Sequence, residues 1–239
     1  MPTTTRQELL CVPAHEKIHS FIEETLSMVC DSLGLRRDCL QHDYETGSVG
    51  TSSGSRGLGS IRHKYDKIRN CTSGALLSDM HDLEQAIGID PSPSSIVLDC
   101  GCDCAQLLVH LTLRLKCVGV GIEAVSSRAS VATLLASHAM SRYPYSRVCI
   151  KHGDFTSPQF GPVWLAARVI ILNDLVMDQN MVQVFLDDVT SASPQLEVLV
   201  KTTEITQSHT KDFFTKSGLS RCMCLGQTHY KTCLSIADT

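Results

Sequence analysis

The feature that most constrains the fold is a series of short apolar runs that alternate with helix-like stretches. The apolar runs are 96–98, 117–122, 147–150, 169–172 and 196–200. Such nearly continuous apolar runs are typical of strands buried on both faces of a sheet. The stretches 105–115, 126–140 and 181–189 between them repeat apolar residues at helical spacing. The alternation predicts an α/β fold with a Rossmann-like, doubly wound and mainly parallel sheet.

The regions on either side of this alternation have different patterns. Apolar residues at helical spacing predict an N-terminal helix over 13–33, and residues 221–225 and 229–236 predict a C-terminal antiparallel hairpin. Five Gly and five Ser between residues 47 and 60 predict a flexible linker or loop. We therefore expect an N-terminal helical segment (1–46), a Gly/Ser-rich and basic linker (47–70) and a main domain (71–239).

Charge and cysteine content narrow the class of protein. A formal charge of -4 argues against a general polyanion binder. The N-terminus has no apolar signal segment and no run approaches 18 apolar residues, so we expect an intracellular protein without a membrane span. The 12 cysteines are then expected as thiols. Cys100, Cys102 and Cys104 alternate rather than pair at zinc-ligand spacing, so no metal site is predicted.

Polar residues follow each of the first four apolar runs, and they are the candidate binding residues. Asp99 follows the first run, Glu123 the second, Asp154 and Phe155 the third, and Asn173 and Asp174 the fourth. In an open α/β sheet, ligands bind beyond the carboxyl ends of the strands. The structural alternative to a binding role is that each acid caps the N-terminus of the helix that follows it.

The spacing of the acids favours a particular ligand chemistry. Glu123 lies 24 residues after Asp99, where a carboxylate accepts both hydroxyls of a ribose. Asp154 is placed to accept from an exocyclic adenine amine. A ligand with adenosine and a cationic amino-acid tail suits three acids better than a dinucleotide with two phosphates does.

These motifs resemble the class I S-adenosylmethionine-dependent methyltransferases from about residue 76 onward. Within that class, "IVLDCGCDCAQ", "VGVGIEA", "HGDFTS" and "VIILNDLVMD" are most similar to the non-SET histone H3 lysine methyltransferases, the disruptor-of-telomeric-silencing family. The resemblance implies S-adenosyl-L-methionine as cofactor. The residues that it implies for cofactor binding are Asp99, Gly101, Cys102, Gln106, Glu123, Asp154, Phe155 and Asn173.

The loop after Asp99 departs from the pattern of that family, which is Asp-x-Gly-x-Gly-x-Gly-Gln. Asp103 and Ala105 stand where the family has its second and third glycines, so the glycine loop is degenerate. Glycine serves there because the backbone needs unusual dihedral angles and a close approach to the ligand. Cys104, at the expected start of a helix, is a candidate for a lowered pKa.

The resemblance implies N-methylation of a lysine in the core of histone H3. Asn173 and Asp174 are then the candidate catalytic residues, Asn173 orienting the amine and Asp174 acting either as a base or as a helix N-cap. Two alternatives stay open: a methyltransferase fold that binds or assembles without catalysis, and a methyltransferase acting on RNA or a small molecule. The basic segment from Arg56 to Arg69 is a candidate contact for nucleosomes or nucleic acid. The histone hypothesis places the protein in the nucleus, and the others leave it in the cytoplasm.

Overall fold

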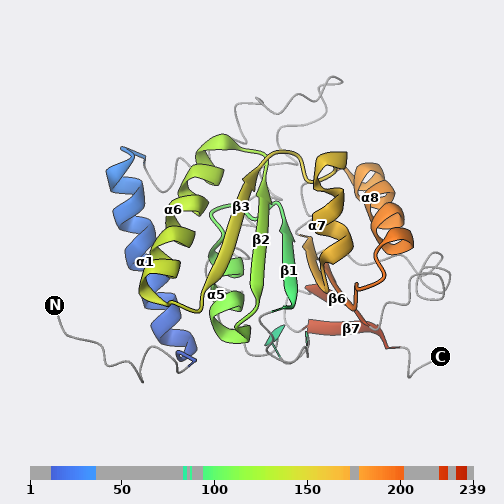
Figure 1. Cartoon of the computed structure of the whole chain (residues 1–239), viewed down its shortest axis with the longest axis horizontal. Coiled ribbons are helices and arrows are strands. Elements are labelled where there is room, and N and C mark those ends of the chain that lie inside the picture. The colour runs from blue at the N-terminus through green and yellow to red at the C-terminus, as the bar shows by residue number, and fades with distance from the viewer. Residues whose placement is uncertain are drawn as a thin grey trace.

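The computed structural model describes residues 12–35, 83, 84, 87, 94–172, 178–201, 221–225 and 230–235 (Figure 1). The predicted linker, the basic segment from Arg56 to Arg69, Asn173 and Asp174 lie outside these residues. The described helices are α1 (His15–Ser32), α5 (Gln106–Leu115), α6 (Ser126–Arg142), the 3-10 helix η3 (Pro158–Phe160), α7 (Gly161–Ala166) and α8 (Gln179–Ala192). The strands are β1 (Ile96–Cys100), β2 (Val118–Glu123), β3 (Arg147–His152), β4 (Val169–Leu172), β5 (Val198–Lys201), β6 (Arg221–Leu225) and β7 (Tyr230–Ser235).

The strands form one sheet in the order β3-β2-β1-β4-β5-β6-β7. The first five strands are parallel, which confirms the predicted Rossmann-like core. β6 runs parallel to β5 and pairs antiparallel with β7. The strand order reverses between β1 and β4, because the chain moves outward to β2 and β3 before it returns. In doubly wound sheets such a reversal point is where ligands bind.

Successive side chains of the strands enter two separate cores, one on each face of the sheet. Val97 and Ile171 point to the face covered by α1, α5 and α6. Leu98 and Ile170, their neighbours along the strands, point to the face covered by α7 and α8. This alternation follows from the two-residue period of a strand. It explains why β1, β2, β4 and β5 are largely apolar, since each of them is buried on both faces, whereas the edge strand β3 is mostly exposed.

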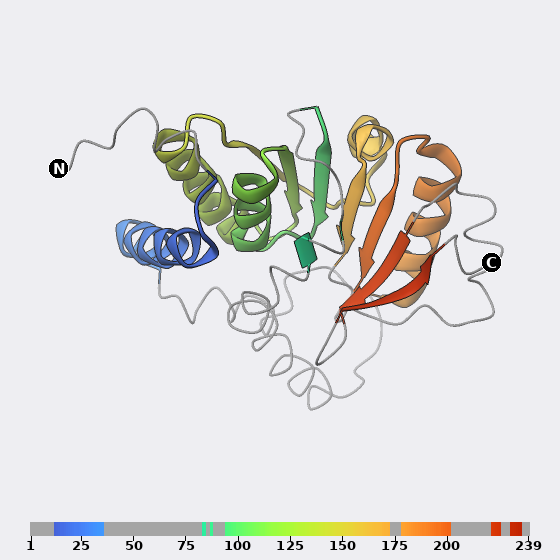
Figure 2. The ribbon, with the colours of Figure 1, turned by 90° about the horizontal axis from the view of Figure 1, so that it is seen from below.

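The N-terminal helix α1 is part of the first core. Ile18, Ile22, Leu26 and Val29 are at most 2% exposed and belong to the same cluster as residues of α5 and α6. Figure 2 shows α1 beside α5 and α6, on the side of the molecule far from α8. The predicted helix over 13–33 is confirmed, with ends at His15 and Ser32.

The described part of the chain contains no helix long and apolar enough to cross a membrane. No pattern in the sequence indicated η3 and α7, which are short and begin at proline-containing turns. They place Trp164 and Phe160 against the second core. Trp164 packs edge-on against Phe185 of α8, with ring centroids 5.3 Å apart.

Candidate functional site

The predicted acids lie along one edge of the sheet because their strands are parallel and in register. Asp99 of β1 is paired with Gly121 of β2, two residues before Glu123. Glu123 is in turn paired with His152 of β3, two residues before Asp154. The carboxyl ends of three neighbouring strands therefore carry the three acids. This edge adjoins the point between β1 and β4 at which the strand order reverses.

The loop from Gly101 to Ala105 folds back over the end of β2. The backbone N–H groups of Gly101 and Cys102 donate to the carbonyl oxygen of Ile122, at 2.8 and 3.1 Å. Gly101, Asp103 and Ala105 all have positive φ, at 77°, 51° and 60°. For the two residues with a Cβ, this left-handed conformation costs about 1–2 kcal/mol each. The loop thus keeps the alternating backbone conformation of a glycine loop at two positions where the glycines are absent.

Glu123 is hydrogen-bonded to this loop, and its side chain is buried, with only 2% of the residue exposed. Its Oε2 accepts from the backbone N–H of Asp103 at 2.9 Å, and its Oε1 accepts from that of Val125 at 2.8 Å. A carboxylate offers about four acceptor positions, so the capacity to accept two hydroxyl groups remains. The chemistry of Glu123 therefore fits a ribose, although the loop already uses half of its acceptor capacity.

Buried negative charge gathers beneath the loop. Burial raises the pKa of Asp99 to about 7, and the charges of Glu123 and Asp103 add to the increase. Burial also raises the pKa of Glu123, while its backbone hydrogen bonds and Arg128 oppose that increase. A bound cation would relieve the repulsion among these acids, whereas a phosphate would add to it. The electrostatics of the site therefore favour a cationic ligand.

Arg128 is the residue of this site that sequence reasoning missed. It lies in the first turn of α6 and is 4% exposed. Its Nε is 3.5 Å from Oδ1 of Asp103, and its charge opposes the increase in the pKa of Glu123. The sequence contained one indication of its role. Arg128 lies five residues after Glu123, in a helix that follows a strand ending in an acid. The ion pair joins the loop after β1 to the helix after β2.

The third strand end is arranged differently. Asp154 is exposed, and its Oδ1 accepts from the backbone N–H and the hydroxyl of Thr156, at 2.9 and 2.7 Å. Phe155 is buried in the second core, edge-on to Phe185 with ring centroids 4.9 Å apart. Gly153 donates its backbone N–H to the carbonyl oxygen of Glu123 at 2.9 Å. This bond joins the ends of β2 and β3, while the Asp154 side chain is used locally.

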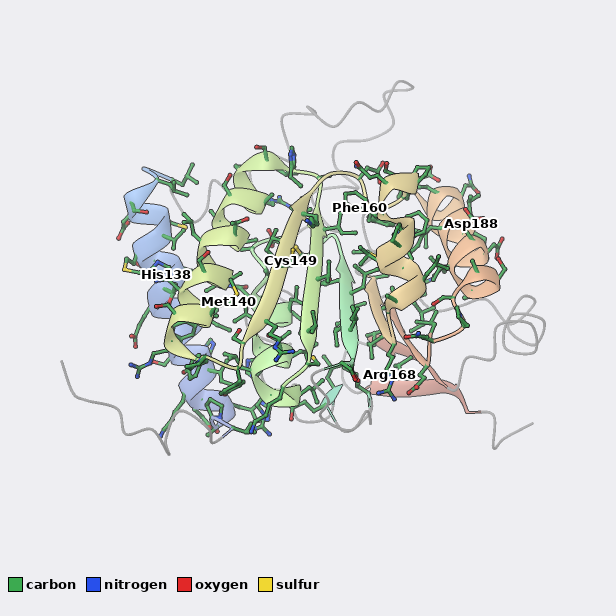
Figure 3. All side chains as sticks on the ribbon, in the orientation of Figure 1. His138, Met140, Cys149, Phe160, Arg168 and Asp188 are labelled. Atoms are coloured by element: carbon green, nitrogen blue, oxygen red, sulfur yellow. The ribbon has the colours of Figure 1, made fainter. Side chains whose placement is uncertain are left out.

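The cysteines of the loop are small buried residues rather than reactive thiols. Cys102 lies directly over Gly121, so that a Cβ on Gly121 would fall 2.6 Å from its Sγ. The pKa of Cys104 is raised, contrary to the lowered pKa expected at a helix start, because burial and Asp103 outweigh the attraction of Arg128. Among the six cysteines between residues 30 and 149 whose side chains the structure describes, Cys149 of β3 is the exposed one (Figure 3).

Of the remaining predicted residues, Gln106 begins α5 and is partly exposed. Its helix has Ala105 as N-cap, which offers no side-chain hydrogen bond to the N–H groups of the first turn. The two predicted catalytic residues, Asn173 and Asp174, lie beyond the described end of β4 at Leu172 and remain predictions.

Comparison with known proteins finds resemblance at the level of structure alone. No model of a known protein family matches the chain, and no curated protein matches it. Solved structures that match include an RNA methyltransferase from Salinibacter ruber with S-adenosyl-L-homocysteine, at 16% identity and a TM-score of 0.37 over 48% of this chain and 69% of that one. TrmK from M. capricolum, also with S-adenosyl-homocysteine, matches at 12% identity and a TM-score of 0.40 over 62% of this chain and 64% of the other.

A third similar structure is geranyl diphosphate C-methyltransferase from Streptomyces coelicolor A3(2), at 14% identity and a TM-score of 0.38. That match covers 59% of this chain and 47% of the methyltransferase. The chain thus spans about half to two thirds of the length of these proteins. None of the three descriptions names a histone. The assignment of the fold depends on the strand order and pairing seen in this structure.

Proposed function

We propose that this protein binds S-adenosyl-L-methionine at the carboxyl edge of β1 and β2 and is a methyltransferase. The observation that carries the proposal is the loop over Glu123, with positive φ at Gly101, Asp103 and Ala105. Residues held in an unfavourable backbone conformation cluster at functional sites, where the surrounding fold imposes that conformation. Its preservation without two of the glycines supports a loop shaped to approach a ligand closely.

The buried acids support the choice of ligand. Glu123 would accept the ribose hydroxyls with the acceptor positions that Asp103 and Val125 leave open. Asp99 and Asp103 would face the positive charge of the amino-acid tail, and Arg128 its carboxylate. The cofactor, when bound, supplies an electrophilic methyl group, and the contribution of the protein is then alignment and exclusion of water.

The acceptor that we propose is a lysine side chain of histone H3, with Asn173 orienting its amine. The support for this acceptor is the resemblance of the motifs, together with the basic segment from Arg56 to Arg69 as a contact for nucleosomes. The histone hypothesis also implies a nuclear protein. Methylation assays with labelled cofactor on nucleosomes and on RNA would distinguish this acceptor from the RNA alternative.

The test of cofactor binding is calorimetric titration of the full chain with S-adenosyl-L-homocysteine. Glu123→Gln should weaken binding by roughly 10- to 100-fold, because a hydrogen bond to a charged group contributes about 1.5–3 kcal/mol. Asp188→Asn, which changes an exposed acid of α8 (Figure 3), should leave binding unchanged. Equal affinity of the Glu123→Gln variant and the wild-type protein would contradict the ribose role.

A second candidate function, binding or assembly without catalysis, is favoured by one specific observation. The backbone N–H of Asp103 already occupies one acceptor position of the Glu123 carboxylate. The Asp103–Arg128 ion pair holds the loop against the strand ends in the absence of a ligand. This function predicts a folded protein with no measurable affinity for S-adenosyl-L-homocysteine. The same titration therefore separates the two functions.

A further inference from the structure

Away from the edge of the sheet, three metal-ligating side chains meet between α1 and α5. His15 is the first residue of α1, and His110 lies in the second turn of α5. Glu84 is a helical residue that precedes β1 in the sequence. One ligand atom from each lies within 4.8 Å of the others. The fold thus brings together His15 and His110, which are 95 positions apart in the sequence. Histidine and glutamate are residue types that bind Zn²⁺ in proteins.

The two histidines face each other at close range. His15 Nδ1 and His110 Nε2 are 2.8 Å apart, and the rings are 25° from parallel. His110 is fully buried, and its Nδ1 has no hydrogen-bond partner among the described residues. The neutral imidazole is the form of histidine that binds metals.

Glu84 is held in place by Arg114. The guanidinium donates from Nε to Oε1 at 2.8 Å and from a terminal nitrogen to Oε2 at 3.0 Å. His15 Nε2 lies 3.7 Å from Oε2 of the same carboxylate. Arg114 uses two of about four acceptor positions, so the carboxylate retains positions for a metal ion. Partners of this kind fix the orientation of metal ligands, although the positive charge of Arg114 also weakens cation binding.

The start of α1 carries a second histidine one helical turn after His15. His15-Glu16-Lys17-Ile18-His19 has the H-E-x-x-H spacing, which places two histidines on one helix face. His19 Nδ1 is buried without a hydrogen-bond partner among the described residues, whereas Glu16 is exposed to solvent. Glu16 is not one of the three clustered side chains, which are those of His15, Glu84 and His110.

We propose that His15, Glu84 and His110 form a Zn²⁺ site that joins α1 to α5. Zn–N bonds of about 2.0–2.1 Å in tetrahedral geometry place two nitrogens about 3.3 Å apart. Because the two imidazole nitrogens are 2.8 Å apart, the rings need to separate by about half an ångström. The ion replaces the single hydrogen between these nitrogens, and water completes its coordination.

The experiment uses the full chain after removal of metals with a chelator, under a reductant without thiol groups. Zn²⁺ is titrated by calorimetry, and Co²⁺ serves as the spectroscopic probe because thiolate ligands give it an intense charge-transfer band. His15→Gln is the test variant, and His138→Gln, an exposed histidine of α6 (Figure 3), is the matched control. The thermal midpoint of each protein is measured with and without Zn²⁺.

We expect one ion per chain, at least tenfold weaker binding for His15→Gln and unchanged binding for His138→Gln. Zn²⁺ should raise the thermal midpoint of the wild-type protein and of His138→Gln, but not that of His15→Gln. Absence of binding by the wild-type protein would overturn the proposal. Equal affinity of His15→Gln, or a thiolate band in the Co²⁺ spectrum, would show that other groups of this cysteine-rich chain bind the ion. The outcome is independent of cofactor binding.

Discussion

Replacing Asp99 by Asn should make the protein more stable at neutral and alkaline pH. Asp99 is 4% exposed, and burial beside Glu123 and Asp103 raises its pKa from the ordinary 3.8 to about 7. Below pH 3.8 the carboxyl group is protonated in both the folded and the unfolded protein. Between pH 4 and pH 7 the folded protein holds a proton that the unfolded chain releases, so the free energy of unfolding falls as the pH rises.

The magnitude follows from the two pKa values. The difference between 3.8 and about 7 corresponds to about 4 kcal/mol, at 1.36 kcal/mol for each unit of pKa. The Asn variant has no titrating group at position 99, so it does not lose this free energy of unfolding as the pH rises. Its advantage over the wild-type protein should therefore be small at pH 4, grow through pH 5 and 6, and reach its full value above pH 7.

Urea unfolding at pH 4, 5, 6, 7 and 8 measures this difference. Asp187→Asn, which alters an exposed acid of α8, is the matched control and should shift stability by a few tenths of a kcal/mol at most. Parallel pH profiles for Asp99→Asn and the wild-type protein would refute the reasoning. Such profiles would mean that the Asp99 carboxyl group titrates in the folded protein as it does in the unfolded chain.

Three further predictions concern the loop and the cysteines. Ala105→Gly should raise the free energy of unfolding by about 0.5–1 kcal/mol, because relief of the positive φ exceeds the entropy cost of glycine; a loss of stability on urea unfolding would contradict the strain. Gly121→Ala should cost about 1–3 kcal/mol through its clash with the Sγ of Cys102, and Cys102→Ala should restore part of that loss in a double-mutant cycle. Under native conditions iodoacetamide should modify Cys149 before the buried Cys30, Cys100, Cys102, Cys104 and Cys117, and mass mapping that finds Cys102 modified first would show that the loop opens.

Most of the parallel core could be predicted from the sequence, because β1, β2, β4 and β5 are each buried on two faces. The run Val169-Ile170-Ile171-Leu172 contains no polar residue, as expected for a strand that is buried on both faces. The structure places β4 at those four residues. The boundaries of α8 were less predictable. The helix extends to Gln179 and Ala192, and its N-cap Asp178 accepts from the backbone N–H groups of Asn180 and Met181.

The site was predictable in its acids but not in its electrostatics. Asp99 and Glu123 follow from where the apolar runs end, whereas the Asp103–Arg128 pair depends on how the loop after β1 crosses the end of β2. The backbone conformation at Asp103 and Ala105 could not be predicted from the sequence, which shows only that two glycines of the loop are replaced. The structure keeps the positive φ at both positions, because hydrogen bonds to Ile122 and Glu123 fix the backbone around them.

The position of α1 leads to an expectation for the order in which this protein folds and opens. The contacts of α1 with α5 join residues about 100 positions apart, as in the bond from Arg114 to the carbonyl oxygen of Pro13. Closing so large a loop is entropically costly, so α1 should dock after the parallel strands have assembled. The same segment should be the first to detach in partial unfolding, and amide hydrogens near Cys30 should exchange with solvent before those of β1. We therefore expect the N-terminal helix to be the last part of the first core to form and the first to open.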